Sequence, residues 1–272
     1  MKTARAVPVL MYHHVSPTPG LVTITPQHFA EQMHWLAQAG YRTLGGDEFA
    51  GFLAGGPVAD KSVLLTFDDG YLDNWVHAHP VLEQYGLRAL LFVVSNWIHD
   101  GPPRPHAGNG TPPATPAHNA CKAAIADGRA DEVILRWSEV AAMREAGTFE
   151  FHSHTHTHTR WDRACSDAAE KRQRLAGDLR TARATLAART GRASDHLCWP
   201  QGYFDADYLD VAHSAGFRHL YTVQPGVNEP GDDPRHIHRI VVKDRPARWL
   251  ATRLWIYRQP RAGRLYVRLR GK

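Results

Sequence analysis

The sequence predicts an α/β protein whose parallel strands close, or nearly close, into a barrel. Three observations support this fold class. Short apolar segments alternate with helical patterns along most of the 272 residues, which is typical of a parallel sheet with crossover helices. Several apolar segments are followed directly by polar clusters. In parallel barrels the active site forms at the carboxyl ends of the strands, so we expect these clusters to meet.

The first half of the chain predicts three strands, at residues 7–12, 62–67 and 87–94. A helix begins at Thr25-Pro26, with threonine as N-cap and proline in the first turn, and ends at Gly40. A shorter helix is expected at 47–53. Another spans 74–85 and ends at Gly86, with Pro80 perturbing it.

The second half begins with an aperiodic segment, residues 100–121, which is dense in proline and glycine and predicts an excursion loop or lid. Helices are then expected at 137–146, about 166–190, and 205–215, each followed by a glycine. The remaining strands are expected at 148–151, 196–199, 218–223 and 237–242.

The size and composition predict one large domain, residues 1–243, with a tail at 244–272. A hydrophobic content of 43% suffices for a sizeable core. Three cysteines, an odd number, argue against a disulfide framework and favour a reducing compartment. We see no signal-peptide pattern at the N-terminus and no apolar run of about 20 residues. These features predict a cytoplasmic protein.

The C-terminal segment is strongly basic. From Arg235 onward there are 12 Lys or Arg and one acid, so this part carries +11 and the remainder −6. Without a nucleic-acid-binding motif, no nucleic-acid partner is expected. The tail mixes arginines with aromatic and aliphatic residues, which suits a helix lying peripherally on an anionic inner membrane. The alternative is a helix packed on the barrel with a solvated basic face.

The stretch Ser62–Tyr71 joins a buried strand to two adjacent carboxylates, Asp68 and Asp69. Neighbouring residues of a strand point to opposite sides, so one aspartate can bind a cation while the other faces a water or substrate. The simpler interpretation is a turn with Asp-Gly at its tip.

A histidine-rich run, His152 to His158, follows the strand at 148–151. If the chain turns helically after His154, then His154 and His158 point the same way and can hold one metal. With Asp69 they supply two imidazoles and one carboxylate, the open pattern of catalytic zinc sites. The alternative is adventitious metal binding at the surface.

These motifs resemble those of the polysaccharide deacetylase superfamily (NodB homology, carbohydrate esterase family 4). The similar segments are LTFDDGY at 65–71, SHTHTH at 153–158, WSEVAAMREAG at 137–147 and WPQGYFD at 199–205. The segments PVLMYHHVSP and PGVNEPGDDPRHIHRI resemble the circularly permuted branch that includes the poly-N-acetylglucosamine deacetylases. The resemblance covers about residues 7–243 and implies an irregular (β/α)7-type barrel.

The resemblance also implies roles. The metal ligands would be Asp69, His154 and His158, holding one divalent ion, zinc or alternatively nickel or cobalt. Asp68 would be the general base, His13 (with His14 as runner-up) the general acid, and the backbone N–H of Gln201 the oxyanion donor. Substrate contacts are expected from Tyr71, Trp199, Pro200, Gly202, Tyr203 and Arg239.

The sequence departs from the family pattern at two positions. Cys198 replaces the arginine that normally pairs with the catalytic aspartate, and Gln201 replaces an aromatic residue. A neutral thiol cannot hold Asp68 ionised; Arg239 is the candidate cation in its place.

The expected function is metal-dependent removal of the N-acetyl group from an amino sugar of an envelope glycan, such as a lipopolysaccharide sugar, or of its lipid-linked precursor. The alternatives are a deformylase or O-acetyl esterase of the same fold, and a catalytically silent glycan-binding protein.

Overall fold

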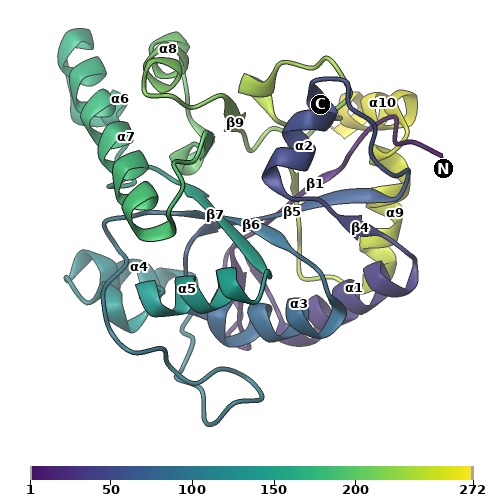
Figure 1. The fold of residues 1–272 in the computed structure, drawn as a ribbon, viewed down its shortest axis with the longest axis horizontal. Coiled ribbons are helices and arrows are strands. Elements are labelled where there is room, and N and C mark those ends of the chain that lie inside the picture. The colour runs from purple at the N-terminus through teal and green to yellow at the C-terminus, as the bar shows by residue number, and fades with distance from the viewer. Residues whose placement is uncertain (1, 271–272) are drawn as a thin grey trace.

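A computed structural model describes residues 2–270, without the Arg270 side chain, and its central feature is a curled parallel sheet (Figure 1). The strand order is β10-β1-β5-β6-β7-β8-β9, and every pairing in it is parallel. The strands are β1 Val9–Tyr12, β5 Ser62–Asp69, β6 Ala89–Val93, β7 Phe149–Ser153, β8 His196–Cys198, β9 His219–Tyr221 and β10 Ile240–Val241. The α/β barrel prediction is therefore confirmed.

One extended segment nearly closes the barrel. Ile237 forms a parallel bridge to Tyr221 of β9, and three residues later Ile240 pairs with Leu10 of β1. The same segment thus contacts the last strand and the first. The expected strand 237–242 is broken into this bridge and the two residues of β10.

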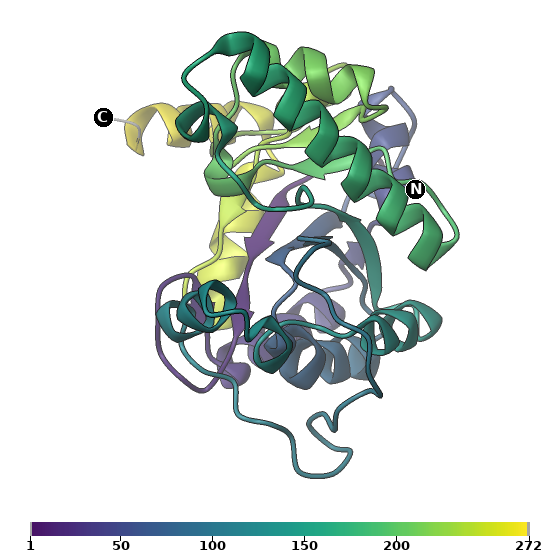
Figure 2. The ribbon, with the colours of Figure 1, turned by 90° about the vertical axis from the view of Figure 1, so that its left-hand side faces the viewer.

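Helices cover the outside of the sheet (Figures 1 and 2). They are α1 Pro26–Gln38, α2 Gly46–Leu53, α3 His79–Tyr85, α4 His118–Ala126, α5 Trp137–Glu145, α6 Trp161–Ala164, α7 Ala168–Thr190, α8 Ala206–Ser214, α9 Ala247–Tyr257 and α10 Pro260–Arg270. Thr25 caps α1 as predicted, with its hydroxyl accepting from the N–H of His28. The helix expected at 74–85 opens with a π-helical turn at Asn74–Ala78, directly before Pro80, and a proline there cannot supply its backbone N–H.

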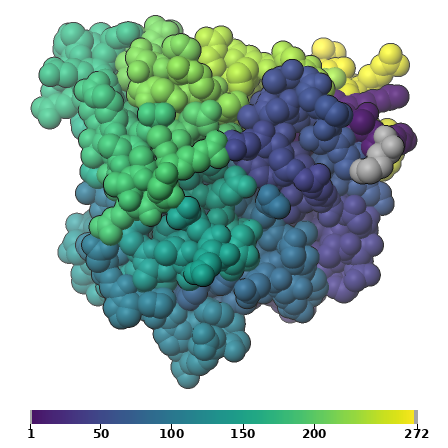
Figure 3. Space-filling view, viewed as in Figure 1, coloured from purple at the N-terminus to yellow at the C-terminus, as the bar shows by residue number. Residues whose placement is uncertain are grey.

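Several small elements were not predicted. They are β2 His14–Val15, β3 Thr23–Ile24, β4 Arg42–Thr43 and the 3-10 turns Ala130–Glu132, Pro200–Gly202 and Pro234–His236. The expectation of a loop over 100–121 is wrong at its end, because α4 begins at His118. The part before α4 does protrude from the body as a loop (Figure 3).

The C-terminal tail forms two helices. α9 packs against α1, and its Leu250, Leu254 and Tyr257 are buried in the main core. The packed-helix alternative therefore describes α9. α10 instead leaves Leu265 and Leu269 59% and 68% exposed.

No helix among residues 2–270 is long and apolar enough to cross a bilayer. Cys121, Cys165 and Cys198 are all free thiols.

Candidate active site

Asp68 and Asp69 end β5 and are almost fully buried. The backbone then turns sharply, with φ of +76° at Asp69 and +82° at Gly70. A side chain at position 70 would place its Cβ 3.0 Å from Cγ1 of Val93, which explains the glycine. The turn sets the two carboxylates at the carboxyl edge of the sheet, where the sequence placed them.

The histidine run follows β7 as a tight loop, and the expected helical turn after His154 is wrong. Thr155 and His158 adopt left-handed conformations, with φ of +68° and +60°. The N–H of His158 donates to Oγ1 of Thr155, and Oδ1 of Asp178 accepts from the N–H groups of His156 and Thr157. These bonds to side chains replace helical ones and still bring His154 and His158 together, with ring centroids 5.0 Å apart.

Asp69, His154 and His158 form a cluster suited to a divalent cation. Oδ1 of Asp69 lies 3.3 Å from Nε2 of His154 and 3.5 Å from Nε2 of His158. Nδ1 of His154 must carry a proton, because it donates to the carbonyl oxygen of Cys198 at 2.8 Å. Burial opposes the charged form of His154, but Cys198 and Asp69 raise its pKa well above the usual value, so without a metal Nε2 holds a proton toward Asp69, which a bound cation would replace. Burial lowers the pKa of His158 to about 4, so this ring is neutral and offers a lone pair. The residues present therefore fit a metal.

Asp68 is paired with Arg239, which is 0% exposed. The guanidinium binds both carboxylate oxygens, Nη1 to Oδ1 at 2.7 Å and Nη2 to Oδ2 at 2.8 Å. Burial alone would raise the pKa of Asp68, but the charge of Arg239, with smaller contributions from the neighbouring histidines, holds the pKa below its usual value. Burial also raises the pKa of Cys198, so the thiol stays neutral and Arg239 supplies the cation that position 198 lacks.

His13 and His14 have different surroundings. Nε2 of His13 lies 3.7 Å from Oδ2 of Asp68, and burial lowers its pKa against the opposing charges of Asp68 and Asp69. His14 is buried, with Nδ1 2.6 Å from Oδ2 of Asp73. Its ring stacks on Tyr71 at 3.8 Å between centroids. The geometry thus sets His13 beside the aspartates and gives His14 a packing role.

One cavity of about 520 Å³ is lined by His13, Asp68, Asp69, His154 and His158. Of the residues expected to contact substrate, Tyr71, Trp199 and Gly202 line it, as does Gln201. The lining leaves out Pro200, Tyr203 and Arg239. Arg239 lies behind Asp68 and is enclosed by protein, so it faces the carboxylate instead of a substrate.

Sequence reasoning missed part of the cavity wall. Leu21, Val22 and Val223 line it, together with His118, Lys122, Ile125 and Ala126 from α4. The proline-rich composition before residue 118 concealed this helix. Among the described residues, the protruding loop itself adds nothing to the cavity lining.

Backbone strain gathers at this cavity. Five non-glycine residues in the described chain have positive φ: Val22, Asp69, Thr155, His158 and Gln201. Four of them line the cavity, and Thr155 lies in the loop between two metal-ligand candidates. Such conformations cost about 1–3 kcal/mol each and concentrate at functional sites.

The fold and the cavity together define a parallel barrel protein with an Asp/His cluster, able to hold a divalent metal, beside a second ionised carboxylate. Residues 55–220 match the family model for polysaccharide deacetylase, which is more than half of the chain. The chain therefore belongs to the polysaccharide deacetylase family, as the NodB-homology motifs indicated.

Individual relatives support this assignment. The poly-β-1,6-N-acetyl-D-glucosamine N-deacetylase of Staphylococcus epidermidis is 25% identical over 82% of this chain and 68% of its own length. The matched region spans only 33% of the Bacillus subtilis protein YxkH, at 40% identity over 34% of this chain. Among solved structures, IcaB from Ammonifex degensii is 25% identical with a TM-score of 0.71, over 92% of this chain and 97% of that one. Streptococcus pyogenes deacetylase PplD, 18% identical with a TM-score of 0.74 over 93% and 99% of the two chains, shares the fold.

Proposed function

We propose that this protein hydrolyses the N-acetyl group of an amino sugar. The observation that carries the proposal is that His13, Asp68, Asp69, His154 and His158 line one cavity in a chain of this family. Relatives whose names state an activity act on poly-β-1,6-N-acetyl-D-glucosamine, which supports an N-acetylated glycan as substrate class.

Asp69, His154 and His158 would hold one divalent ion, with zinc favoured by the two imidazoles and one carboxylate, and nickel or cobalt as alternatives. When bound, such an ion acidifies a water and polarises the acyl oxygen.

Asp68 serves as the general base in this proposal. It is held ionised by Arg239 and accepts the proton of the attacking water. His13 serves as the general acid toward the leaving nitrogen. Nε2 of His13 lies 3.7 Å from Oδ2 of Asp68, so the base and the acid face the same cavity. The N–H of Gln201, in a left-handed turn at the cavity wall, is assigned to the developing oxyanion.

The cavity wall suits a sugar ring. Tyr71, Trp97 and Trp199 line it, and aromatic faces pack against the apolar faces of pyranose rings. The silent glycan-binding alternative was motivated by the missing arginine at position 198. Arg239 pairs with Asp68 in its place, which removes this motivation. A deformylase or O-acetyl esterase would use the same side chains, so only the choice of substrate distinguishes these activities from N-deacetylation.

The decisive experiment measures metal content and acetate release from N-acetylglucosamine oligomers. Asp68→Asn keeps the shape and should lower the rate by about 10²–10⁴-fold while metal content stays unchanged. Asp100→Asn is the matched control, since Asp100 is an exposed aspartate paired with Arg189. Metal content without acetate release by the wild type, on oligomers and on lipid-linked sugars alike, would refute deacetylation.

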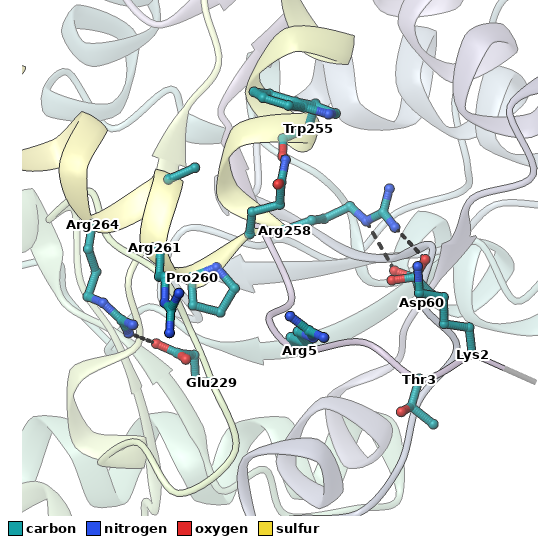
Figure 4. Close-up of a pocket in the computed structure, with 12 residues that line it drawn as sticks. Lys2, Thr3, Arg5, Asp60, Glu229, Trp255, Arg258, Pro260, Arg261 and Arg264 are labelled. Carbon is teal, nitrogen blue, oxygen red and sulfur yellow. Dashed lines mark hydrogen bonds and ion pairs between the residues drawn. The ribbon is translucent and has the colours of Figure 1, made fainter.

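We also propose that the C-terminal helices contact an anionic membrane, which would bring the enzyme to a lipid-linked precursor. Trp255 of α9 is 60% exposed, and Leu265 and Leu269 of α10 are exposed as well. Figure 4 shows basic side chains from these helices and from the N-terminal segment around a cavity of about 800 Å³. Arg258 pairs with Asp60 and Arg264 with Glu229.

Charge complementarity favours an anionic surface there. Lys2, Arg5 and Arg261 also line this cavity and have no carboxylate partner within the described chain. Peripheral helices bind acidic lipids through exposed apolar side chains together with unpaired cations, and this part of the chain offers both.

Cosedimentation with phosphatidylglycerol vesicles tests this contact. Arg261→Glu should weaken binding at least about fivefold, since a basic residue near the surface contributes about 1 kcal/mol. The double variant Leu265→Ser, Leu269→Ser should weaken it further. Arg180→Glu, an exposed arginine on α7, is the matched control. Equal sedimentation of all variants, or none for the wild type, would refute the contact.

A further inference from the structure

A second group of histidines lies away from the cavity, on the neighbouring strands β7, β8 and β9. His152, His196 and His219 form a row, with ring centroids 4.7 Å and 4.5 Å apart. His196 and His219 are the first residues of β8 and β9, so they occupy the edge of the sheet opposite the catalytic one. Asp195 lies beside this pair, and Glu150 lies beside His152.

Each of the three rings has a buried nitrogen without a hydrogen-bond partner in the described chain. These atoms are Nε2 of His152, Nε2 of His196 and Nδ1 of His219. His196 is only 1% exposed. Each of the three nitrogens faces a carboxylate oxygen at 3.4–3.7 Å, too far for a good hydrogen bond. Buried polar atoms are nearly always satisfied, and imidazole nitrogens and carboxylates at this separation are the arrangement that a cation would bridge.

Neighbouring side chains hold two of these rings in place. Nδ1 of His152 lies 2.8 Å from Oγ of Ser194, which also lies 3.2 Å from the carbonyl oxygen of His196. Nδ1 of His196 lies 2.9 Å from the hydroxyl of Tyr221, an outer contact of the kind that orients metal-binding imidazoles.

The spacing of Asp195, His196 and His219 suits a single cation. Oδ1 of Asp195 lies 3.4 Å from Nε2 of His196, and Oδ2 lies 3.4 Å from Nδ1 of His219. Ligand atoms at about 2.0–2.1 Å from a tetrahedral zinc lie roughly 3.4 Å apart. The catalytic cluster shows the same separations, 3.3 Å and 3.5 Å.

The cluster also has room and access. Asp195 and His196, with His152, line a cavity of about 380 Å³, and His219 lies outside its lining. Gly46, the first residue of α2, lies beside two of the rings: a Cβ there would lie 3.1 Å from Nε2 of His196 and 3.3 Å from Nε2 of His152. The glycine leaves the space beside these nitrogens open.

We propose that Asp195, His196 and His219 form a second divalent-metal site, of the class that zinc fills, at the amino end of β8 and β9. Its ligands come from two adjacent strands, so a bound ion ties their beginnings together. The site is separate from Asp69, His154 and His158 and does not depend on the proposed deacetylase activity.

Metal stoichiometry tests the proposal. Protein stripped by chelator, reloaded with zinc and dialysed should hold two equivalents by mass spectrometry. His219→Gln should hold one and release acetate at the wild-type rate. His158→Gln should also hold one, with acetate release lost. His213→Gln, a change at an exposed histidine on α8, should keep both.

A second readout guards against misfolding of the His219 variant. In the His158→Gln background, zinc should raise the melting temperature. This rise should vanish when Asp195→Asn is added, a nearly isosteric change at a side chain that is 38% exposed. A wild type with one equivalent, a His219→Gln protein that still holds two, or a zinc response that survives Asp195→Asn would each overturn the second site. The number of bound zinc ions tests the second site even if the protein releases no acetate.

Discussion

Replacing Arg239 with methionine should strongly destabilise the protein. Arg239 is fully buried and donates to both oxygens of Asp68, to the Thr222 carbonyl oxygen and to Oγ1 of Thr66. Methionine fills much of the volume but leaves the Asp68 carboxylate buried without its cation. Removing one partner of a buried pair costs about 3–5 kcal/mol, against a total stability of roughly 5–15 kcal/mol.

The assay is urea unfolding of chelator-treated protein at neutral pH. A double-mutant cycle with Asp68→Asn isolates the pair from the loss of packing. Because the double variant leaves no charge at this pair, it should be more stable than Arg239→Met alone by about 2 kcal/mol or more. Two results would refute the reasoning. One is that the stability losses of the two single variants add up to that of the double variant within about 0.5 kcal/mol. The other is that Arg239→Met loses less than about 1 kcal/mol of unfolding free energy.

The pH dependence provides an independent check. In the wild type the pKa of Asp68 is lowered, so its contribution to stability is present above the unfolded value of about 3.9 and is lost as the pH falls. In Arg239→Met, burial acts unopposed by that charge and should raise this pKa. The difference in unfolding free energy between the wild type and Arg239→Met should therefore shrink as the pH falls from about 7 toward about 4, where the carboxyl of the variant becomes protonated.

Three further changes test neighbouring parts of the site. His13→Gln should lower acetate release by about 10²–10⁴-fold with unchanged stability. His14→Gln should instead cost about 1–3 kcal/mol of stability, because it leaves the buried Asp73 short of a partner. If both variants changed rate and stability alike, His13 and His14 would not have these separate roles. His158→Gln should abolish acetate release, and added zinc should not restore it; full activity would remove that histidine from the metal site. Gly202→Ala should destabilise the oxyanion turn, because φ is +69° and the new Cβ would meet Cγ2 of Val223 at 2.3 Å. Adding Val223→Ala should recover part of that loss, and thermal melting measures both.

The barrel and the positions of its polar clusters were predictable because they depend on local patterns. The apolar run of β5 ends in Asp68 and Asp69, and the strand before the histidine run was placed within two residues. Helix ends at Gly86 and Gly191 followed from left-handed conformations that glycine adopts easily.

Other features depend on contacts between distant segments and left no local pattern. The short strands β2 and β3 pair only with each other, and two residues carry no periodicity. His154 and His158 converge through bonds to Asp178, which lies 20 residues beyond His158. The spacing of four was correct, but it did not reveal that a loop would replace the helical turn.

The cation for Asp68 comes from the segment that closes the barrel between β9 and β1. Docking of this segment therefore both closes the barrel and supplies the charge that keeps Asp68 ionised. A chain folded only as far as β9 would carry every proposed metal ligand, yet Asp68 would lack the charge that opposes burial. Metal binding can then precede activity during folding, and the onset of acetate release would report that the last strand has docked.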